Sequence, residues 1–457
     1  MKSNRIPTYI INLKNRTDRR DHILQQFEGR DEFHTTIVDA QRHEIGSIGL
    51  WNTIKDIVTQ ALAKEQDYIL ICEDDHVFTA AYSKETLHQA ISEAVSIHAD
   101  ILSGGVSWHG DGVAISDTLF WVKKFSGTQF IIVFKKFFQT IIDADFTKAD
   151  TADSKMTDCS EHVYFIHPFI SIQKEFGYSD ATDRNNGTSR VEQLFIQSAA
   201  GANINRNIRS FYKTPLVAEV IANEQDDDDT TIPVYIMNLP ERTERREHIL
   251  REFEGRPEFD ITMVEACKND IGALGHWHSV RKIIQLAIDN DDDVIIICED
   301  DHEFTPAYSR EMLFKNIYMA YQQGCDYCSG GAGKFDLAVP ITNNLFWTNH
   351  CLSAQFIIVF RKFFQKILDA PFDDTVIGDI KISELTGNKM IIFPYISNQK
   401  NFGYSDITAL HNSIDGIVQL MFAVSEERLV KMSQVFITHS ERKKTISSDS
   451  STSILVK

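Results

Sequence analysis

The segment YILICEDDH, Tyr68–His76, recurs almost unchanged as VIIICEDDH, Val294–His302, which is 226 residues later (298 − 72). The same offset relates Asn12 to Asn238, Arg20 to Arg246, Gly49 to Gly275 and Gln129 to Gln355. A short, continuous apolar run is typical of a strand that is buried on both faces of a sheet. The chain is therefore a tandem duplication, and each copy places three acidic residues at the carboxyl end of a buried strand.

Length and the repeat together predict two domains of similar fold. The chain has 457 residues, of which 43% are apolar and 24% charged, as in ordinary globular proteins. The first domain is predicted to span residues 1–222 and the second residues 232–440. The acidic stretch between them, residues 223–231, is predicted to be a solvated linker. The tail, residues 441–457, has little apolar periodicity and is predicted to be disordered.

Charge and cysteine usage exclude several classes of protein. The net charge is −19, which argues against general binding to nucleic acid or to anionic membranes. No stretch is long and apolar enough for a membrane span, and the N-terminus does not resemble a signal peptide, so a cytoplasmic location is expected. Cysteines number seven, and the lone CxxC pair Cys325 and Cys328 is interpreted as structural.

The order of apolar patterns predicts an α/β fold. In the first copy an apolar run at Tyr9–Leu13 predicts a strand, and Trp51, Ile54, Ile57 and Val58 fall on one face of a predicted helix. QFIIVF, Gln129–Phe134, predicts a further strand before a helix. These patterns indicate three-layer domains with mostly parallel central sheets, in which ligands bind at the carboxyl edge of the strands.

The three carboxylates of each copy are candidate metal ligands. Like charges repel and burial disfavours ionisation, so such a cluster usually needs a cation. Carboxylate oxygens suit Mg²⁺ or Mn²⁺. In an extended chain Glu73 and Asp75 would share one cation while Asp74 points elsewhere. The alternative is a solvated acidic turn. The candidate metal ligands are Glu73, Asp74, Asp75, Glu299, Asp300 and Asp301.

A cluster of arginines after the first strand of each copy is the second candidate site. It lies in NLKNRTDRR, Asn12–Arg20, and in NLPERTERR, Asn238–Arg246. The spacing of three and four places the guanidinium groups on one helix face. Because cations oppose the dipole at a helix N-terminus, a phosphate-bearing ligand would relieve the conflict. The alternative is neutralisation by neighbouring acidic residues on the surface. The candidate arginines are Arg16, Arg19, Arg20, Arg242, Arg245 and Arg246.

Together, INLxxRTxRR, the glycines Gly46 and Gly49 before a helix, and a strand that ends in EDD resemble glycosyltransferase family 25. This family includes lipooligosaccharide and procollagen galactosyltransferases. The resemblance covers most of each copy. It implies a GT-A fold, a nucleotide-sugar donor, and a divalent cation, Mn²⁺ or Mg²⁺, that bridges the EDD carboxylates to the donor diphosphate. By the same resemblance, donor binding falls on the six arginines and on Asn12, Asn238, Gly49 and Gly275.

The two copies depart from the family pattern after the second glycine. The first reads GLWNTI, Gly49–Ile54, and the second GHWHSV, Gly275–Val280, so the family's serine and histidine pair survives only as Ser279. His276 and His278 occur in the second copy alone. At the start of an amphipathic helix such histidines are more often solvated or hydrogen-bonded than ligands.

An inverting transfer needs a base that accepts the proton of the acceptor hydroxyl. The candidates are Asp153 and its twin Asp379, and Asp180 and its twin Asp406 in the repeated FGYSD. An exposed aspartate or a helix cap explains each equally well.

The sequence therefore predicts a metal-dependent glycosyltransferase. It would move a hexose, galactose or glucose, from a nucleotide-diphosphate sugar, most simply a UDP-sugar, to a saccharide or glycoconjugate acceptor. One alternative is a sugar nucleotidyltransferase, although Asn12–Arg20 lacks the glycines of a phosphate loop. Another is a module that binds a nucleotide sugar or a glycan without turnover.

Overall fold

The computed structural model describes residues 5–177, 190–212, 230–352, 354–373, 377–403 and 416–452, with side chains described up to residue 442. The chain divides into two compact units, Met1–Asn207 and Ile208–Lys457. The boundary thus lies before the position predicted from the repeat. The predicted linker, residues 223–231, lies outside the described residues except for its last two.

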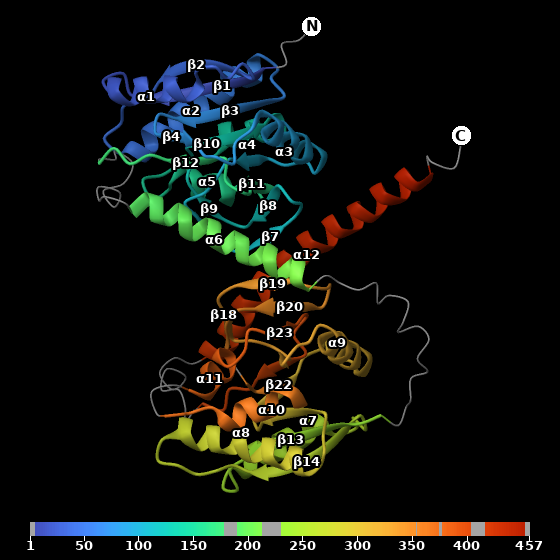
Figure 1. The fold of residues 1–457 in the computed structure, drawn as a ribbon. Helices are drawn as coiled ribbons and strands as arrows, with labels where there is room; N and C mark the ends of the chain where they lie inside the picture. Colours follow the sequence, from blue (N-terminus) through green and yellow to red (C-terminus); the bar gives the residue numbers. More distant parts are fainter. Residues whose placement is uncertain are drawn as a thin grey trace. The chain divides into compact units, whose positions relative to one another are not determined.

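The first unit alternates strands and helices as the apolar patterns predict (Figure 1). Its elements are β1 (Ile6–Asn12), α1 (Thr17–Phe27), β2 (Phe33–Asp39), α2 (Gly46–Ala63), β3 (Tyr68–Glu73), β4 (His76–Phe78), α3 (Lys84–Ser96), β5 (Ile101–Ser103), β6 (Trp108–His109), β7 (Gly112–Ala114), β8 (Leu119–Val122), β9 (Phe125–Ser126), β10 (Phe130–Phe134), α4 (Lys135–Asp143), α5 (Ala152–Asp158), β11 (Val163–Ile166), β12 (Ser171–Gln173) and α6 (Arg190–Phe211). The unit ends within α6, at Asn207.

The second unit repeats this order. Its elements are β13 (Ile232–Asn238), α7 (Thr243–Phe253), β14 (Phe259–Glu265), α8 (Gly272–Asp289), β15 (Val294–Glu299), β16 (His302–Phe304), α9 (Arg310–Gln322), β17 (Tyr327–Ser329), β18 (Lys334–Phe335), β19 (Ala338–Pro340), β20 (Leu345–Thr348), β21 (Cys351–Leu352), β22 (Phe356–Phe360), α10 (Arg361–Asp369), α11 (Gly378–Glu384), β23 (Lys389–Ile392), β24 (Ser397–Gln399) and α12 (Ile417–Thr452).

Each unit is built on one mixed sheet. In the first, the strand order is β2-β1-β3-β10-β5-β11-β8-β7, and the second repeats it as β14-β13-β15-β22-β17-β23-β20-β19. β1 pairs in parallel with β2 and β3, whereas β10 and β8 run against their neighbours. The predicted α/β class is confirmed, and the prediction of a mostly parallel sheet holds for the β2-β1-β3 side. QFIIVF forms an antiparallel strand because its apolar pattern specifies burial and not direction.

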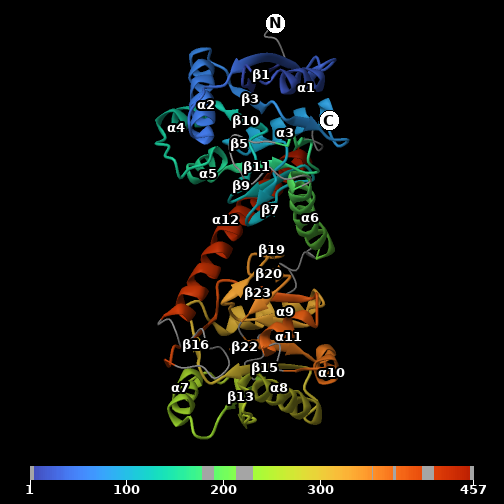
Figure 2. The same ribbon diagram turned by 90° about the vertical axis from the view of Figure 1, so that its left-hand side faces the viewer.

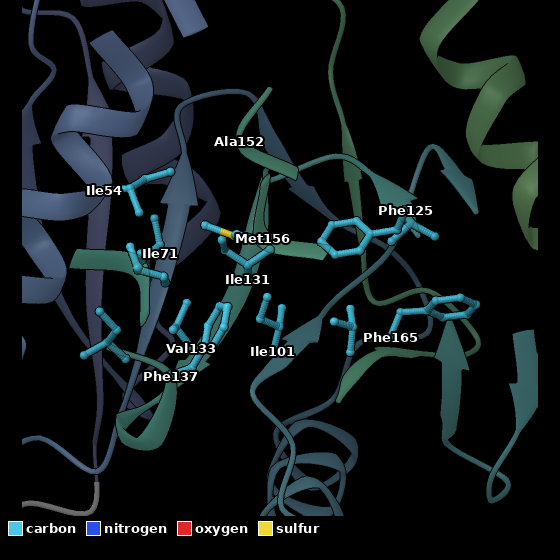
Figure 3. Packing of buried hydrophobic residues seen from close by; sticks show 14 of the residues in the cluster. Ile54, Ile71, Ile101, Phe125, Ile131, Val133, Phe137, Ala152, Met156 and Phe165 are labelled. Atoms are coloured by element: carbon cyan, nitrogen blue, oxygen red, sulfur yellow. The ribbon is translucent and has the colours of Figure 1, made fainter. Parts of the chain in front are cut away.

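Helices cover both faces of the sheet, so each unit has three layers. In the first unit α2 and α4 lie on one side and α1 and α3 on the other (Figure 2). The layer between α2, α4 and the sheet is a core of apolar side chains (Figure 3). There Ile54 of α2 and Phe137 of α4 pack with Ile71 and Val133 of the strands. In the second unit, α8 and α10 form the corresponding core and α7 and α9 the opposite one.

The tail differs from the prediction. α12 continues through Thr452, so residues 441–452 are helical in the structure. Glutamate, arginine and lysine in ERKK, residues 441–444, are good helix formers, whereas the propensity of the residues that follow does not explain why the helix continues. Among the described residues, no helix is long and apolar enough to cross a membrane.

Candidate functional site

The acidic segment of each unit is a turn held by a buried arginine. β3 ends at Glu73, and Asp74 and Asp75 form the turn that leads to β4. Both aspartates therefore point to one partner: Nη1 of Arg19 lies 3.3 Å from Oδ1 of Asp74 and 3.5 Å from Oδ2 of Asp75. The predicted alternation along an extended chain does not occur, because the strand has already ended.

In the second unit the same arrangement is tighter. Nη1 of Arg245 lies 3.1 Å from Oδ1 of Asp300 and 3.1 Å from Oδ2 of Asp301. Asn238 at the end of β13 donates to the other oxygen of Asp300 at 2.8 Å. Gln399 of β24 donates to Oδ2 of Asp301 at 3.0 Å. Both oxygens of Asp300 thus accept bonds from protein groups, whereas Oδ1 of Asp301 is buried without a hydrogen-bond partner.

The predicted arginine cluster is divided by the structure. Arg19 and Arg245 are buried against the acidic turns, and Arg16 and Arg242 are partly buried at the residue before each helix. The third arginine of each cluster, Arg20 or Arg246, is exposed. Adjacent helical residues differ by about 100° in direction, so when the first points inward the next points to solvent. The acidic turn supplies counter-charge to Arg19 and Arg245.

The first acidic residue of each turn has a different partner in the two units. In the first unit, Thr128 donates its hydroxyl to Glu73. In the second, the equivalent residue is Ala354, and Nε2 of His276 lies 3.1 Å from Oε1 of Glu299. His276, Glu299 and Asp379 place one ligand atom each within 4.8 Å of one another. The second unit therefore has an imidazole where the first has a hydroxyl.

Burial and mutual repulsion govern the titration of these groups. Burial first, and then the charge of Asp75, raise the pKa of Glu73 to about 8 although the Thr128 hydrogen bond lowers it. Burial and the charges of Glu299 and Asp300 raise the pKa of Asp301 to about 7. Carboxyl groups that resist ionisation in this way gain from a bound cation.

His276 responds to the same acidic environment. Burial lowers its pKa, but the hydrogen bond and charge of Glu299, helped by the charges of Asp379 and Asp301, outweigh burial, and the pKa of His276 is raised. The side chain is 5% exposed. The imidazole therefore compensates negative charge at the acidic turn of the second unit.

A cavity of about 690 Å³ opens at this edge of the second unit's sheet. Its acidic wall includes Glu299, Asp301 and Asp379, and its basic lining includes Arg242, Lys268 and Lys400. His276, Asn238, Arg245 and Gly275 also line it, whereas Arg246 does not. A volume of this size suits a small-molecule or cofactor site. Carboxylates and cations thus meet in one space at the carboxyl edge of β13 and β15, where the sequence predicts ligand binding.

The glycine predicted to bind the donor has a packing role. A Cβ at Gly275 would lie 2.5 Å from the carbonyl oxygen of Cys267, and a Cβ at Gly49 would lie 2.5 Å from that of Gln41. Each glycine thus lets its helix start against the preceding loop. Gly275 supports the cavity wall through this contact.

Two of the four candidate bases, Asp153 and Asp379, lie among the described residues. Asp153 and Asp379 lie in the first helical turns of α5 and α11. Asp153 is near Glu73, and Asp379 is near Glu299. Asp153 accepts from the backbone N–H of Gly127 at 3.0 Å and of Ser154 at 2.8 Å. Asp180 and Asp406 lie outside the described residues and stay predictions.

A second cluster of potential metal ligands in the second unit makes hydrogen bonds that hold the fold together. His248, Glu252 and Glu303 lie close together in the second unit. Nε2 of His248 lies 2.9 Å from the carbonyl oxygen of His302, and Nδ1 lies 3.3 Å from Nζ of Lys400. Glu252 accepts from the backbone N–H of Phe304 at 3.0 Å. These bonds tie α7 to β16 and leave the imidazole engaged at both nitrogens.

His276 is the site residue that sequence reasoning passed over, because it was interpreted as a solvated or structural histidine. A signal for it exists in the repeat. Three positions around the first acidic residue change together between the copies. They are Leu50 and His276, Thr128 and Ala354, and Ala152 and Gly378.

Comparisons with known proteins do not identify a family. No family model matches the chain, and no curated protein matches it. Among solved structures, A197 from STIV has a TM-score of 0.25 at 14% identity, covering 35% of this chain and 81% of that one. An apo UDP-glucose pyrophosphorylase has a TM-score of 0.26 at 11% identity, covering 44% of this chain and 82% of that one. At such TM-scores neither likeness carries an argument about fold or function.

Proposed function

We propose that the second unit is a metal-dependent glycosyltransferase that binds a nucleotide-diphosphate sugar in the cavity at the carboxyl edge of β13 and β15. The observation that carries the proposal is the meeting of an acidic wall and basic side chains in one cavity of about 690 Å³. A diphosphate needs cations around its oxygens, and an acidic wall beside it is favourable only if a divalent ion lies between them.

The acidic wall fits such an ion. Glu299, Asp301 and Asp379 supply the hard oxygen ligands that Mn²⁺ and Mg²⁺ accept. Oδ1 of Asp301 is buried and has no hydrogen-bond partner, as expected of an atom that awaits a ligand. When bound, the ion would supply charge stabilisation to the departing nucleoside diphosphate.

The remaining residues would bind and orient the donor. Arg242 and Lys268 line the cavity and would contact the diphosphate, and Lys400 adds a third cation. Arg245 would hold Asp300 and Asp301 in place and not contact the donor directly, because it is already paired with both. With Asp379 assigned to the acidic wall, the base of an inverting transfer falls to Asp406, which stays a sequence prediction.

The first test is binding and turnover with a panel of UDP- and GDP-sugars and Mn²⁺. We expect slow release of nucleoside diphosphate from one UDP-hexose without acceptor, and loss of this release in Asp301→Asn. Asp75→Asn in the first unit is the matched control and should retain it. Donor binding without release across the panel would instead favour a binding module. Release of pyrophosphate from UTP and a hexose 1-phosphate would favour a sugar nucleotidyltransferase.

A further inference from the structure

The two units differ at one place in a concerted manner. Glu299 of the second unit faces His276, and the equivalent Glu73 accepts from Thr128. At the position of His276 the first unit has Leu50, which packs against the apolar core. At the position of Thr128 the second unit has Ala354. The hydroxyl partner was thus lost in the unit that gained an imidazole.

A third difference makes room for this imidazole. A Cβ on Gly378 would lie 2.5 Å from Nδ1 of His276, which is too close for any side chain. The first unit has Ala152 at this position, buried in the apolar core (Figure 3). Because Nδ1 packs against Gly378, the other ring nitrogen, Nε2, is the one directed at Glu299.

We propose that the second unit, and not the first, binds one transition-metal ion between Nε2 of His276 and the carboxylates of Glu299 and Asp379. Their ligand atoms lie within 4.8 Å of one another, and all three residues line the cavity. Two ligands of one ion at about 2.1 Å lie roughly 3 to 4 Å apart, so small side-chain movements suffice. Among the described residues, the groups with metal-ligating geometry all belong to the second unit.

A second observation supports a ligand at this place. Oδ1 of Asp301 is buried in the same wall without a hydrogen-bond partner, and the side chain is only 9% exposed. Oδ1 of Asp75 in the first unit is also buried without a partner, so the imidazole, and not this atom, distinguishes the two units. An unsatisfied carboxylate oxygen beside three other potential ligands is costly unless a cation occupies the space. Asp301 can therefore complete the coordination of the ion.

The imidazole sets the class of metal. Mg²⁺ prefers oxygen ligands, whereas an imidazole nitrogen favours transition-metal ions. A site with one imidazole and two or three carboxylates should therefore prefer Mn²⁺ or Co²⁺ to Mg²⁺. The inference rests on the proposed function in assigning the ion to the donor cavity, but metal binding itself can be measured without any nucleotide.

The test is titration of the untagged, metal-free protein with Co²⁺ and Mn²⁺, followed by calorimetry and, for Co²⁺, by visible absorption. We expect one equivalent per chain, with tighter binding than Mg²⁺. His276→Leu should weaken Co²⁺ binding by more than the roughly 10- to 100-fold loss caused by removing an outer-shell partner. His278→Leu, which changes an exposed histidine on the same helix, should leave it unchanged.

Two further variants separate ligation from a structural role. Gly378→Ala removes no ligand, but its Cβ would displace His276 and should lower Co²⁺ affinity. The triple change L50H/T128A/A152G gives the first unit the second unit's residues and should raise the stoichiometry to two. The inference is overturned by two equivalents in the unchanged protein, by no binding, or by unchanged Co²⁺ affinity in His276→Leu. Metal binding without donor turnover would refute only the proposed transferase.

Discussion

Arg245 lies 3.1 Å from Asp301 although the side chains of both residues are at least nine-tenths buried. A buried ion pair is costly to break, because the remaining partner is left as an uncompensated charge away from water. Arg245 also pairs with Asp300, and together these contacts fix the acidic turn at the cavity. Arg245, which was predicted to contact phosphate, thus holds the two carboxylates in place.

Arg245→Gln should destabilise the second unit strongly. We expect a loss of about 3 to 5 kcal/mol in the free energy of unfolding, the range for removing one partner of a buried pair. Arg246→Gln changes an exposed neighbour and should alter stability by less than about 0.5 kcal/mol. Urea unfolding of both variants measures the difference, and equal effects would contradict a structural role for Arg245.

The stability of the first unit should fall as pH rises because of Glu73. Its pKa is raised to about 8 in the folded protein, from an ordinary value of 4.5. Between these values the folded state binds more protons than the unfolded state, so the free energy of unfolding decreases as pH increases. Each pKa unit corresponds to about 1.4 kcal/mol.

Glu73→Gln imitates the protonated carboxyl group and removes its titration. Relative to the unchanged protein, this variant should gain stability progressively between pH 5 and pH 8. Urea unfolding at four pH values with a chelator present measures the gain. Stability curves that stay parallel over this range would mean that the carboxyl group ionises freely in the fold.

Much of the fold follows from the sequence because apolar spacing reports burial directly. Trp51, Ile54, Ile57 and Val58 were assigned to one helix face, and all four are buried in α2. The apolar run of β3 is buried on both faces of the sheet, as predicted. The antiparallel direction of β10 could not be predicted, since strand direction depends on the route of the connections and not on the residues of the strand.

The sequence predicted where the site lies in the fold, but it did not predict which charged side chains pair with one another. The acidic turn and Asn238 do meet, because adjacent parallel strands β13 and β15 end at the same edge. What spacing could not give is the partner of each charge. Arg19 and Arg20 are neighbours in sequence, yet a rotation of about 100° per residue buries one and exposes the other. His276 was missed because a histidine at the start of an amphipathic helix was interpreted as solvated or hydrogen-bonded, and the helix pattern alone does not show that its ring faces Glu299.

Gly275→Ala should destabilise the wall of the cavity. The added Cβ would meet the carbonyl oxygen of Cys267 at 2.5 Å, so the loop before α8 would have to move. Overpacking of this kind typically costs about 1 to 3 kcal/mol. Gly387→Ala is the matched control, because a Cβ there has no neighbour within 4 Å. Thermal unfolding distinguishes the two, and an unchanged midpoint in Gly275→Ala would show that the loop adapts without cost.

Arg242→Ala should weaken donor binding with little effect on folding. Arg242 lines the cavity, is only partly buried, and precedes the first turn of α7, where an anion is favoured by the backbone N–H groups. A hydrogen bond to a charged group contributes about 1.5 to 3 kcal/mol, so the Kd for UDP should rise by at least tenfold. Arg246→Ala removes an equal charge outside the cavity and should change the Kd only slightly. Calorimetry at two salt concentrations tests both, since salt screens the effect of a distant, exposed charge more than that of a close, partly buried contact. Equal losses in the two variants would show that net charge, and not a contact from Arg242, attracts the nucleotide.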